Sequence, residues 1–362
     1  MQIGIVGLPN STKTTLFNAL THSQVETAIT SSGKIEVHTA SVEVPDQRVN
    51  VLSDLFKPRK TTYARVQYND VAGLRASGGK ESALNGQLLN ALSQSDALLH
   101  VVRAFEDEKV PHPEGNVDAV RDLAALDFEF LISDLGIVER RLERLSHDLD
   151  RKGSYPERTM DQAELELLEK LRIALENEQP IRSLELSGEE QRILKGFQFL
   201  TGKPSLIALN VGDDGSEDPG VFSLRVSPAD KIVCLHGALE MEISQLSQED
   251  ADLFLSEYGI QEPGLNRMIR LNYELLGLQS FFTVGEDEVR AWTISQGATA
   301  VEAAGVIHTD LARGFIRAEV VSYQDLVEAG SLAEARNRGK LRLEGKEYIV
   351  QDAAILNIRF NV

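Results

Sequence analysis

The chain has 362 residues, of which 42% are hydrophobic and 26% are charged, and its formal net charge is −19. This length predicts two or three domains, and the composition is that of a globular protein without a membrane-spanning stretch. The negative charge excludes nonspecific attraction to nucleic acid, because duplex binding depends on lysine and arginine neutralising phosphates. The single cysteine, Cys234, excludes an intramolecular disulfide, and the N-terminus resembles no secretory signal, which predicts a cytoplasmic protein.

The first 105 residues alternate short apolar segments with helical stretches, which is typical of an α/β fold with a mostly parallel sheet. The clearest strand is the segment IGIVGL at residues 3–8. The further strands predicted in this region are 36–44, 64–69 and 97–103. The predicted helices follow Lys13, follow Pro45 and cover 87–95.

The sequence from residue 117 to residue 199 is highly charged and helical in pattern. One apolar stripe with steps of three and four residues is formed by Leu135, Val138, Leu142 and Leu145. The breaker GSYPE at 153–157 separates this helix from a second one. We therefore expect an antiparallel helical hairpin that interrupts the sheet domain.

The α/β pattern then resumes with two apolar strands, PSLIALNV at 204–211 and KIVCL at 231–235. Beyond about residue 278 the pattern changes to short strands separated by turns. This change predicts a separate small α+β domain. Its predicted strands are 281–284, 289–294, 315–321 and 354–360.

Residues 7–14, GLPNSTKT, lie between the first strand and a helix and nearly match the phosphate-loop pattern G-x-x-x-x-G-K-[ST]. In this arrangement successive backbone N–H groups and a helix N-terminus form an anion cradle. Lys13 would act in catalysis by reaching the β and γ phosphates, and Thr14 would bind Mg²⁺. The predicted nucleotide-binding residues of this loop are Asn10, Ser11, Thr12, Lys13, Thr14 and Thr15.

Thr12 stands where the phosphate-loop pattern has its second glycine. A Cβ at this position crowds the place where the backbone normally lies against the phosphates. We predict that residues 7–14 descend from a phosphate loop, and Thr12 leaves two possibilities for their present activity. Either efficient hydrolysis survives this replacement, or the nucleotide binds weakly or not at all.

Asp70 and Gly73 form a D-x-x-G motif after a predicted strand. Together with the phosphate loop, this motif is typical of an aspartate that organises Mg²⁺ and a glycine whose N–H contacts the γ phosphate. Taken alone, it is also typical of an ordinary turn. Leu74 stands where many GTPases have a glutamine that orients water, so the motif supplies no obvious catalyst for hydrolysis.

Asn210, Val211 and Asp213 lie at the end of strand 204–211, where a base-reading loop lies in this fold. An Asn and an Asp three residues apart resemble the N-K-x-D signature of guanine readers, whose carboxylate accepts two N–H donors from the base. We predict that these residues bind the purine. The alternative is an acidic turn, since further acidic residues follow directly.

These motifs and the stretch at residues 284–330 together resemble the YchF family of Obg-like ATPases over nearly the whole chain. The resemblance implies a P-loop G domain at 1–116 and 200–277, a coiled-coil insertion at 117–199 and a β-grasp TGS domain at 278–362. It also implies hydrolysis of ATP in preference to GTP, and association with the ribosome, at its large subunit, or with translation factors. By the same analogy His112 assists hydrolysis near the γ phosphate, unless it is an ordinary loop histidine between prolines.

The chain departs from the family pattern around the nucleotide. Asp213 stands where family members have glutamate, so the resemblance leaves the choice between ATP and GTP open. Residues 34–38, KIEVH, replace the family's T-I-E-P-N and lack the threonine expected near Mg²⁺. Gly33 and Ala104 stand where family members often carry cysteine, so we expect no thiol-based redox control.

We therefore expect Mg²⁺-dependent hydrolysis of a purine nucleoside triphosphate as a conformational switch, in which the γ phosphate orders residues 34–39 and 70–80. Lys13, Thr14 and Asp70 favour this enzyme. The rival is a catalytically degenerate interaction protein of the same family, which Thr12 favours. In both cases the expected partner is the ribosome or a translation factor, and not a membrane.

Overall fold

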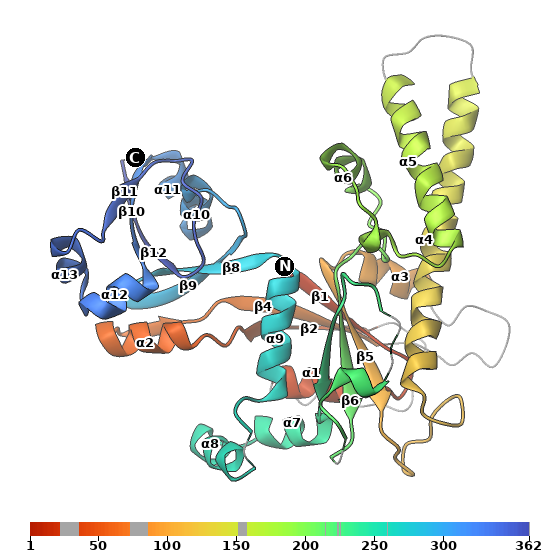
Figure 1. The fold of residues 1–362 in the computed structure, drawn as a ribbon, viewed down its shortest axis with the longest axis horizontal. Coiled ribbons are helices and arrows are strands. Elements are labelled where there is room, and N and C mark those ends of the chain that lie inside the picture. The colour runs from red at the N-terminus through yellow and green to blue at the C-terminus, as the bar shows by residue number, and fades with distance from the viewer. Residues whose placement is uncertain are drawn as a thin grey trace. The chain divides into compact units, whose positions relative to one another are not determined.

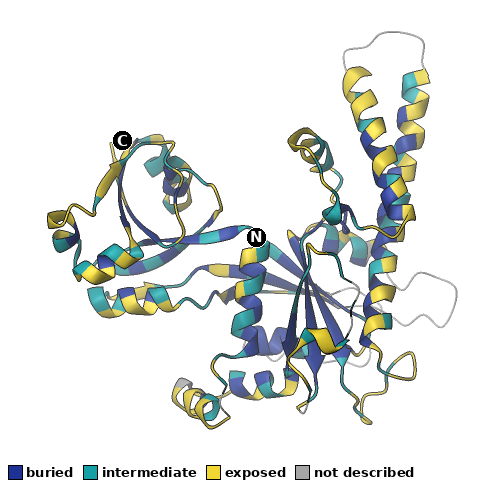
Figure 2. Ribbon diagram, viewed as in Figure 1, coloured by how far each residue is buried: buried dark blue, intermediate teal, exposed yellow. Residues whose placement is uncertain are grey.

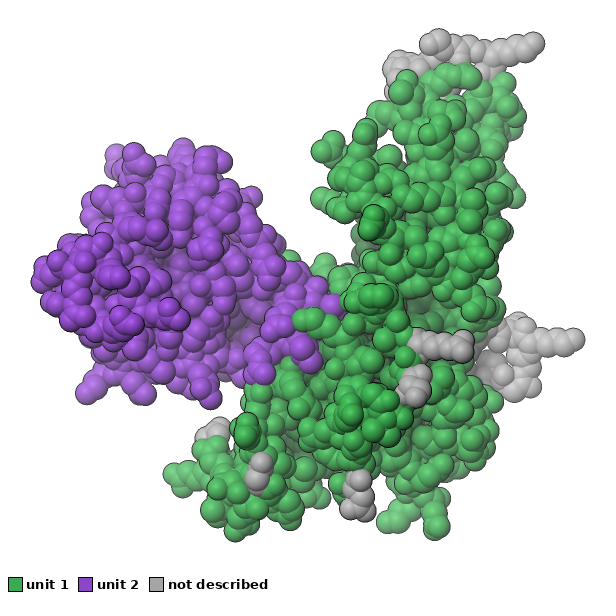
Figure 3. All heavy atoms as spheres, in the orientation of Figure 1, with its two compact units in different colours: residues 1–40, 67–268 green, residues 41–66, 269–362 purple. Residues whose placement is uncertain are grey.

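The computed structural model describes residues 1–21, 36–72, 86–150, 158–213, 215–222, 224, 226–258 and 260–361. The chain forms two compact units, of which unit 1 comprises residues 1–40 and 67–268 and unit 2 comprises residues 41–66 and 269–362 (Figure 3). No helix in the part of the chain that the structure describes is long and apolar enough to span a bilayer.

Unit 1 is built on a six-stranded sheet with the order β2-β4-β1-β5-β6-β7 (Figure 1). Its strands are β1 Gln2–Val6, β2 Glu36–Glu43, β4 Arg65–Ala72, β5 Ala97–Ala104, β6 Ser205–Val211 and β7 Lys231–Leu235. The pairs β1–β4, β1–β5, β5–β6 and β6–β7 are all parallel. The carboxyl ends of β1, β4, β5, β6 and β7 therefore lie at one edge of the sheet, where ligands bind in open α/β sheets.

The central strands of this sheet are buried, because helices cover them (Figure 2). The helices that lie wholly or partly in unit 1 are α1 Lys13–Thr21, α3 Gly86–Ser93, α4 Ala119–Asp150, α5 Arg158–Glu176, α6 Gly188–Leu194, α7 Gly237–Ser244, α8 Gln248–Glu257 and α9 Gly264–Leu275, with short 3-10 helices η1 Ile181–Ser183 and η2 Pro219–Phe222. Leu92 of α3 and Phe130 of α4 share one core cluster with Val6 and Leu98 of the sheet. Cys234 is buried in β7, as its apolar neighbours predict.

The long helices α4 and α5 lie side by side and form the helical hairpin expected from the apolar stripe (Figure 1). Val138 and Leu145 of α4 pack with Leu168 and Leu171 of α5 in a cluster of buried residues. Asp134, fully buried, accepts hydrogen bonds from the backbone N–H groups of residues 200 and 201 at 3.1 and 2.7 Å. This carboxylate therefore fixes the base of the hairpin to the segment that enters β6.

Unit 2 contains a second six-stranded sheet, with the order β11-β10-β12-β8-β9-β3. Its strands are β3 Lys60–Thr62, β8 Leu278–Thr283, β9 Glu288–Ser295, β10 Phe315–Ser322, β11 Arg342–Glu344 and β12 Ala354–Phe360. Its helices are α2 Gln47–Phe56, α10 Ala300–Ile307, α11 Thr309–Arg313, α12 Tyr323–Ala329 and α13 Leu332–Asn337. Phe281, Ile294 and Leu356 belong to its core, against which α10 packs through three alanines.

The predicted fold class is confirmed: the chain has an α/β sheet interrupted by a helical hairpin and a second sheet domain near its C-terminus. The strand and helix segments expected from the sequence are present with ends that differ by a few residues. β3 pairs with β9, so residues 41–66 pack with the C-terminal segment although they lie early in the chain. The domain limits at residues 116, 199 and 277 stay predictions.

Candidate nucleotide site

The phosphate loop lies between β1 and α1 and is shaped by close backbone packing. A Cβ on Gly7 would lie 2.3 Å from the carbonyl oxygen of Val101, so only glycine fits at this position. Lys13 Nζ donates hydrogen bonds to the carbonyl oxygens of Gly7 and Leu8, both at 2.8 Å. Burial lowers the pKa of Lys13 to about 8, and the nearby carboxylate of Asp70 opposes this shift.

Thr14 and Asp70 meet at the base of the loop, although they lie 56 residues apart. Thr14 Oγ1 donates to Asp70 Oδ2 at 3.0 Å, while the buried Asp70 Oδ1 has no hydrogen-bond partner among the described residues. Burial raises the pKa of Asp70, whereas Lys13 and the Thr14 hydroxyl lower it. The Thr14 and Asp70 side chains thus bring together a hydroxyl and a carboxylate, as the sequence predicted.

These oxygen atoms fit Mg²⁺, which prefers hard oxygen ligands and uses one or two protein groups together with water and substrate phosphates. The orphaned Asp70 Oδ1 is an acceptor that a hydrated cation would satisfy. No group of three or more His, Cys, Asp or Glu side chains in the described ranges could hold a metal by itself. Thr14 and Asp70 are therefore the described residues at this site that could hold Mg²⁺, with the nucleotide completing the coordination.

Thr12 and Asn10 both adopt positive φ values, of 70° and 60°. The Thr12 hydroxyl donates to the carbonyl oxygen of Ser11 at 2.5 Å and accepts from Asn210 Nδ2 at 2.5 Å. Asn10 Nδ2 donates to the carbonyl oxygen of Pro111 at 3.2 Å. Side chains of the phosphate loop thus connect it to the loop after β5 and to the end of β6. Thr15 lies in the first turn of α1 and is half-buried.

The predicted base-reading residues lie at the end of β6. Asn210 Oδ1 accepts a hydrogen bond from the N–H of Gly237 at 2.8 Å, and Val211 is buried in the strand. Asp213 is exposed in the turn that follows. His236 Nδ1 donates to the carbonyl oxygen of Gly212 at 2.9 Å, because a carbonyl can only accept.

His236 and Gly237 were not among the residues predicted from the sequence. Both directly follow β7, which pairs in parallel with β6. Parallel neighbours end at the same edge of a sheet, so the residues after β7 necessarily lie beside the base-reading loop. Their position after the strand KIVCL was the signal that could have identified them.

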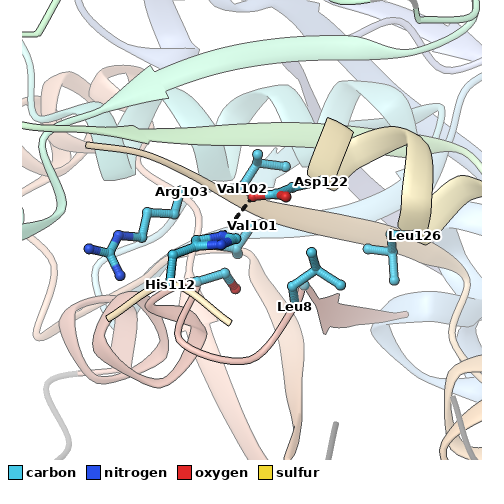
Figure 4. Close-up of a pocket in the computed structure, with 9 residues that line it drawn as sticks. Leu8, Val101, Val102, Arg103, His112, Asp122 and Leu126 are labelled. Atoms are coloured by element: carbon cyan, nitrogen blue, oxygen red, sulfur yellow. Dashed lines mark ion pairs between the residues drawn. The ribbon is translucent and has the colours of Figure 1, made fainter. Parts of the chain in front are cut away.

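His112 lies in a small pocket behind the phosphate loop and points toward Asp122 (Figure 4). Its Nε2 is 2.8 Å from Asp122 Oδ2, and its Nδ1 accepts from the N–H of Glu114 at 3.2 Å. Because Nδ1 accepts, the proton of a neutral ring is on Nε2 and is donated to Asp122. Both ring nitrogens of His112 are therefore engaged in this structure, and its catalytic role stays a prediction.

Arg103 holds the loop that carries His112. Its buried guanidinium donates to the carbonyl oxygens of Phe105 and Val110 at 3.0 and 2.7 Å. Among the other predicted site residues, Gly73 lies outside the described residues, as do Leu74, Lys34 and residues 75–80. The structure therefore brings Lys13, Thr14 and Asp70 together and connects Thr12 to Asn210.

Two family models match this chain. One, described as a 50S ribosome-binding GTPase, matches residues 2–129. The other, YchF-GTPase_C, is described as a protein of unknown function and matches residues 278–361. The two matched segments lie toward the two ends of the chain and leave residues 130–277 between them, which include most of the helical hairpin and β6.

Curated proteins are similar to the chain over its full length. The ribosome-binding ATPase YchF of Bacillus subtilis is 42% identical over 366 residues, with 99% of each chain covered. YchF of Haemophilus influenzae is 43% identical over 363 residues, again with 99% of each covered. The solved structure of the Schizosaccharomyces pombe YchF GTPase has a TM-score of 0.87 and 32% sequence identity, and covers 99% of this chain and 97% of its own. The chain therefore belongs to the YchF family.

Proposed function

We propose that this protein binds and hydrolyses a purine nucleoside triphosphate with Mg²⁺, favours ATP over GTP, and acts as a nucleotide-controlled switch on the ribosome. The contact between Thr14 and Asp70, beside the half-buried Lys13, carries the catalytic part of this proposal. These are the three side chains with which P-loop enzymes hold Mg²⁺ and phosphate. The bacterial relatives described as ribosome-binding ATPases support the ribosomal part.

Each residue has a defined task in this proposal. The backbone N–H groups of the phosphate loop and the N-terminus of α1 bind the phosphate oxygens. Lys13 leaves the carbonyl oxygens of Gly7 and Leu8 and neutralises charge on the β and γ phosphates. Thr14 and Asp70 would hold Mg²⁺, which when bound would supply positive charge to stabilise the phosphates.

His112 is the proposed assisting residue. To act near the γ phosphate its imidazole has to exchange the bond to Asp122 for one to water, because both ring nitrogens are engaged in the described position. The loop of residues 105–116 would then move as part of the switch. Arg103, which binds two carbonyl oxygens of this loop, would hold its N-terminal part in place.

The test of hydrolysis is phosphate release from ATP and GTP by the purified full chain, with and without Mg²⁺. We expect Mg²⁺-dependent turnover, and a loss of at least about 100-fold in Asp70→Asn, because the carboxylate that organises the metal is gone. The matched control is Asp54→Asn, a carboxylate exposed on α2 of unit 2, which should leave turnover unchanged. Turnover that persists in Asp70→Asn would contradict the assignment of the site.

The test of the ribosomal partner is co-sedimentation of the chain with purified large ribosomal subunits, in the cytoplasmic ionic conditions where the proposal places it. Association should be stronger with a non-hydrolysable ATP analogue than with ADP, because a switch binds its partner in one nucleotide state. Equal co-sedimentation with the ATP analogue and with ADP would contradict the switch, because ribosome binding would then not depend on the nucleotide.

A specific observation favours a second candidate, a non-enzymatic interaction protein of the same family. Thr12 places a β-branched side chain at a positive φ inside the phosphate loop. Calorimetric titration with non-hydrolysable ATP and GTP analogues and Mg²⁺ separates the two candidates. Micromolar binding by the native chain supports the switch, whereas binding that appears only in Thr12→Gly supports the interaction protein.

A further inference from the structure

A chain of hydrogen bonds connects the phosphate loop to the end of β6 and to the start of α7, which follows β7. Asn210 Nδ2 donates to Thr12 Oγ1 at 2.5 Å, and Asn210 Oδ1 accepts from the N–H of Gly237 at 2.8 Å. Thr12, Asn210 and Gly237 all belong to unit 1, and Asn210 is only 7% exposed. We call this connection the Thr12–Asn210–Gly237 bridge.

The bridge fixes which way the Asn210 carboxamide faces. The Thr12 hydroxyl has one hydrogen and donates it to the carbonyl oxygen of Ser11, so it can only accept from Asn210. The amide nitrogen of Asn210 must therefore face Thr12, and its oxygen must face Gly237. Both neighbours require the same orientation, so the carboxamide cannot turn over without losing two hydrogen bonds.

Close packing around Gly237 adds to this restriction. A Cβ on Gly237 would lie 2.6 to 2.9 Å from the carboxamide atoms of Asn210, so the side chain lies directly on the backbone of residue 237. His236 connects the same two loops through its 2.9 Å bond to the carbonyl oxygen of Gly212. The purine-binding edge is therefore held by Thr12 from one side and by residues 236 and 237 from the other.

The bridge depends on the residue that departs from the phosphate-loop pattern. Glycine at position 12 would have no hydroxyl and could not hold Asn210. A non-glycine residue at φ 70° is strained, and the two hydrogen bonds at the hydroxyl can offset this strain. Thr12 is thus a strained residue whose side chain is fully engaged, and this combination suggests a function.

We propose that Thr12 determines base specificity in the proposed nucleotide site by selecting a 6-amino purine over a 6-oxo purine. With the bridge formed, the N–H of Gly237 is used by Asn210, while Asn210 Oδ1 keeps one acceptor lone pair. The bridge then offers the Asn210 Oδ1 acceptor to the 6-amino group of adenine. It offers no free N–H donor to the 6-oxo group of guanine. Loss of the Thr12 hydroxyl frees the carboxamide to turn and releases the N–H of Gly237 for a 6-oxo group.

The experiment is calorimetric titration of the full chain and its Thr12→Ser and Thr12→Ala variants with non-hydrolysable ATP and GTP analogues and Mg²⁺. Both variants keep a Cβ at position 12, but only serine keeps the hydroxyl. We expect Thr12→Ser to retain the preference for the ATP analogue. Thr12→Ala should lose at least about fivefold of this preference, mainly by binding the GTP analogue more tightly.

The ratio of the two affinities is the decisive readout, because a purely structural role of Thr12 would change both affinities alike. An equal ratio in Thr12→Ser and Thr12→Ala overturns the inference and leaves the proposed function standing. If only Thr12→Gly binds nucleotide, the side chain at position 12 blocks both purine nucleotides alike, and this outcome also overturns the inference. Binding of no nucleotide by any variant overturns the inference together with the proposed function.

Discussion

The buried His100 and the half-buried Asp127 are titratable groups that the proposed mechanism does not use. His100 Nδ1 lies 3.8 Å from Asp127 Oδ1, and neither ring nitrogen of His100 has a hydrogen-bond partner among the described residues. Burial, with a contribution from Arg182, lowers the pKa of His100 to about 3. Burial raises the pKa of Asp127 to about 6, against the effect of Arg182. Burial therefore disfavours the protonated imidazolium of His100 and the ionised carboxylate of Asp127.

We predict that Asp127→Asn stabilises the protein at neutral pH. The rise of the Asp127 pKa from 3.8 to about 6 corresponds to roughly 3 kcal/mol of destabilisation of the folded protein when the carboxylate is ionised. Because the side chain is 31% exposed, solvent screening reduces this destabilisation to about 1–2 kcal/mol. This loss of stability is complete above pH 6, where the carboxylate is ionised in the folded and in the unfolded protein. It disappears as the pH falls through 6 toward 4, because the folded protein then takes up the proton first. Urea unfolding of both proteins across this range measures it.

The control for this prediction is Glu143→Gln, which changes an exposed carboxylate on the same helix and should leave the free energy of unfolding unchanged at pH 4 and at pH 7. A gain of the same size at pH 4 and pH 7 in Asp127→Asn would show that packing, and not charge, is the cause.

We predict that His112→Ala lowers kcat of nucleotide hydrolysis by about 100-fold, because proton transfer to or from a positioned side chain contributes about 10²–10⁴-fold to a rate. The dissociation constant of a non-hydrolysable analogue should change less than threefold, since His112 points toward Asp122 behind the phosphate loop. Single-turnover kinetics and calorimetry measure the two quantities. His147→Ala, at an exposed position of α4, is the control, and an unchanged kcat in His112→Ala would exclude the catalytic role.

At the scale of elements, the helical hairpin is stable because α4 and α5 share an apolar seam. Leu168 and Leu171 of α5 are fully buried against α4, and the Arg141 guanidinium binds the Glu164 carboxylate at 2.7 and 2.8 Å. Most of the stability of helices in proteins comes from tertiary packing of their apolar face, so packing across the seam provides most of the stability here. The two helices should therefore unfold together.

We predict that Leu168→Ala destabilises the hairpin by about 2–4 kcal/mol, through lost burial and the cavity that remains. Hydrogen exchange should lose protection along both α4 and α5, because the seam holds them together. The matched control, Ile173→Ala on the same helix, removes a side chain that is 55% exposed and should cost less than about 0.5 kcal/mol. Lost protection confined to α5 would contradict a shared seam.

At the scale of the whole molecule, acidic residues outnumber basic ones, 56 to 37. A chain of this charge is repelled by the phosphates of a nucleic acid unless a local surface contacts them specifically. Association with a ribosome, as proposed, would then depend on shape and on a few contacts more than on overall charge.

We predict that random-sequence duplex RNA binds with a dissociation constant weaker than about 10⁻⁴ M at roughly 0.15 M salt. Fluorescence anisotropy with a labelled duplex measures this value, and co-sedimentation with large ribosomal subunits in the same buffer is the comparison. Micromolar binding of the duplex would reveal a concentrated basic surface that the total charge conceals.

The sequence by itself determined the elements and the identity of the phosphate loop. The apolar pattern of β1, the stripe from Leu135 to Leu145 and the pattern around Lys13 are local, and local periodicity and turn chemistry decide such features. The meeting of Thr14 with Asp70 was also predictable, because the motif order implies a known strand arrangement.

Only the tertiary structure decided what these side chains contact. The hydrogen bond between Thr12 and Asn210 joins residues 198 positions apart, and the engagement of His112 by Asp122 depends on how the loop after β5 returns to α4. The addition of β3 to the second sheet likewise pairs residue 62 with residue 290. Such contacts depend on side-chain orientation and strand pairing between distant segments, and local sequence patterns carry no information about either.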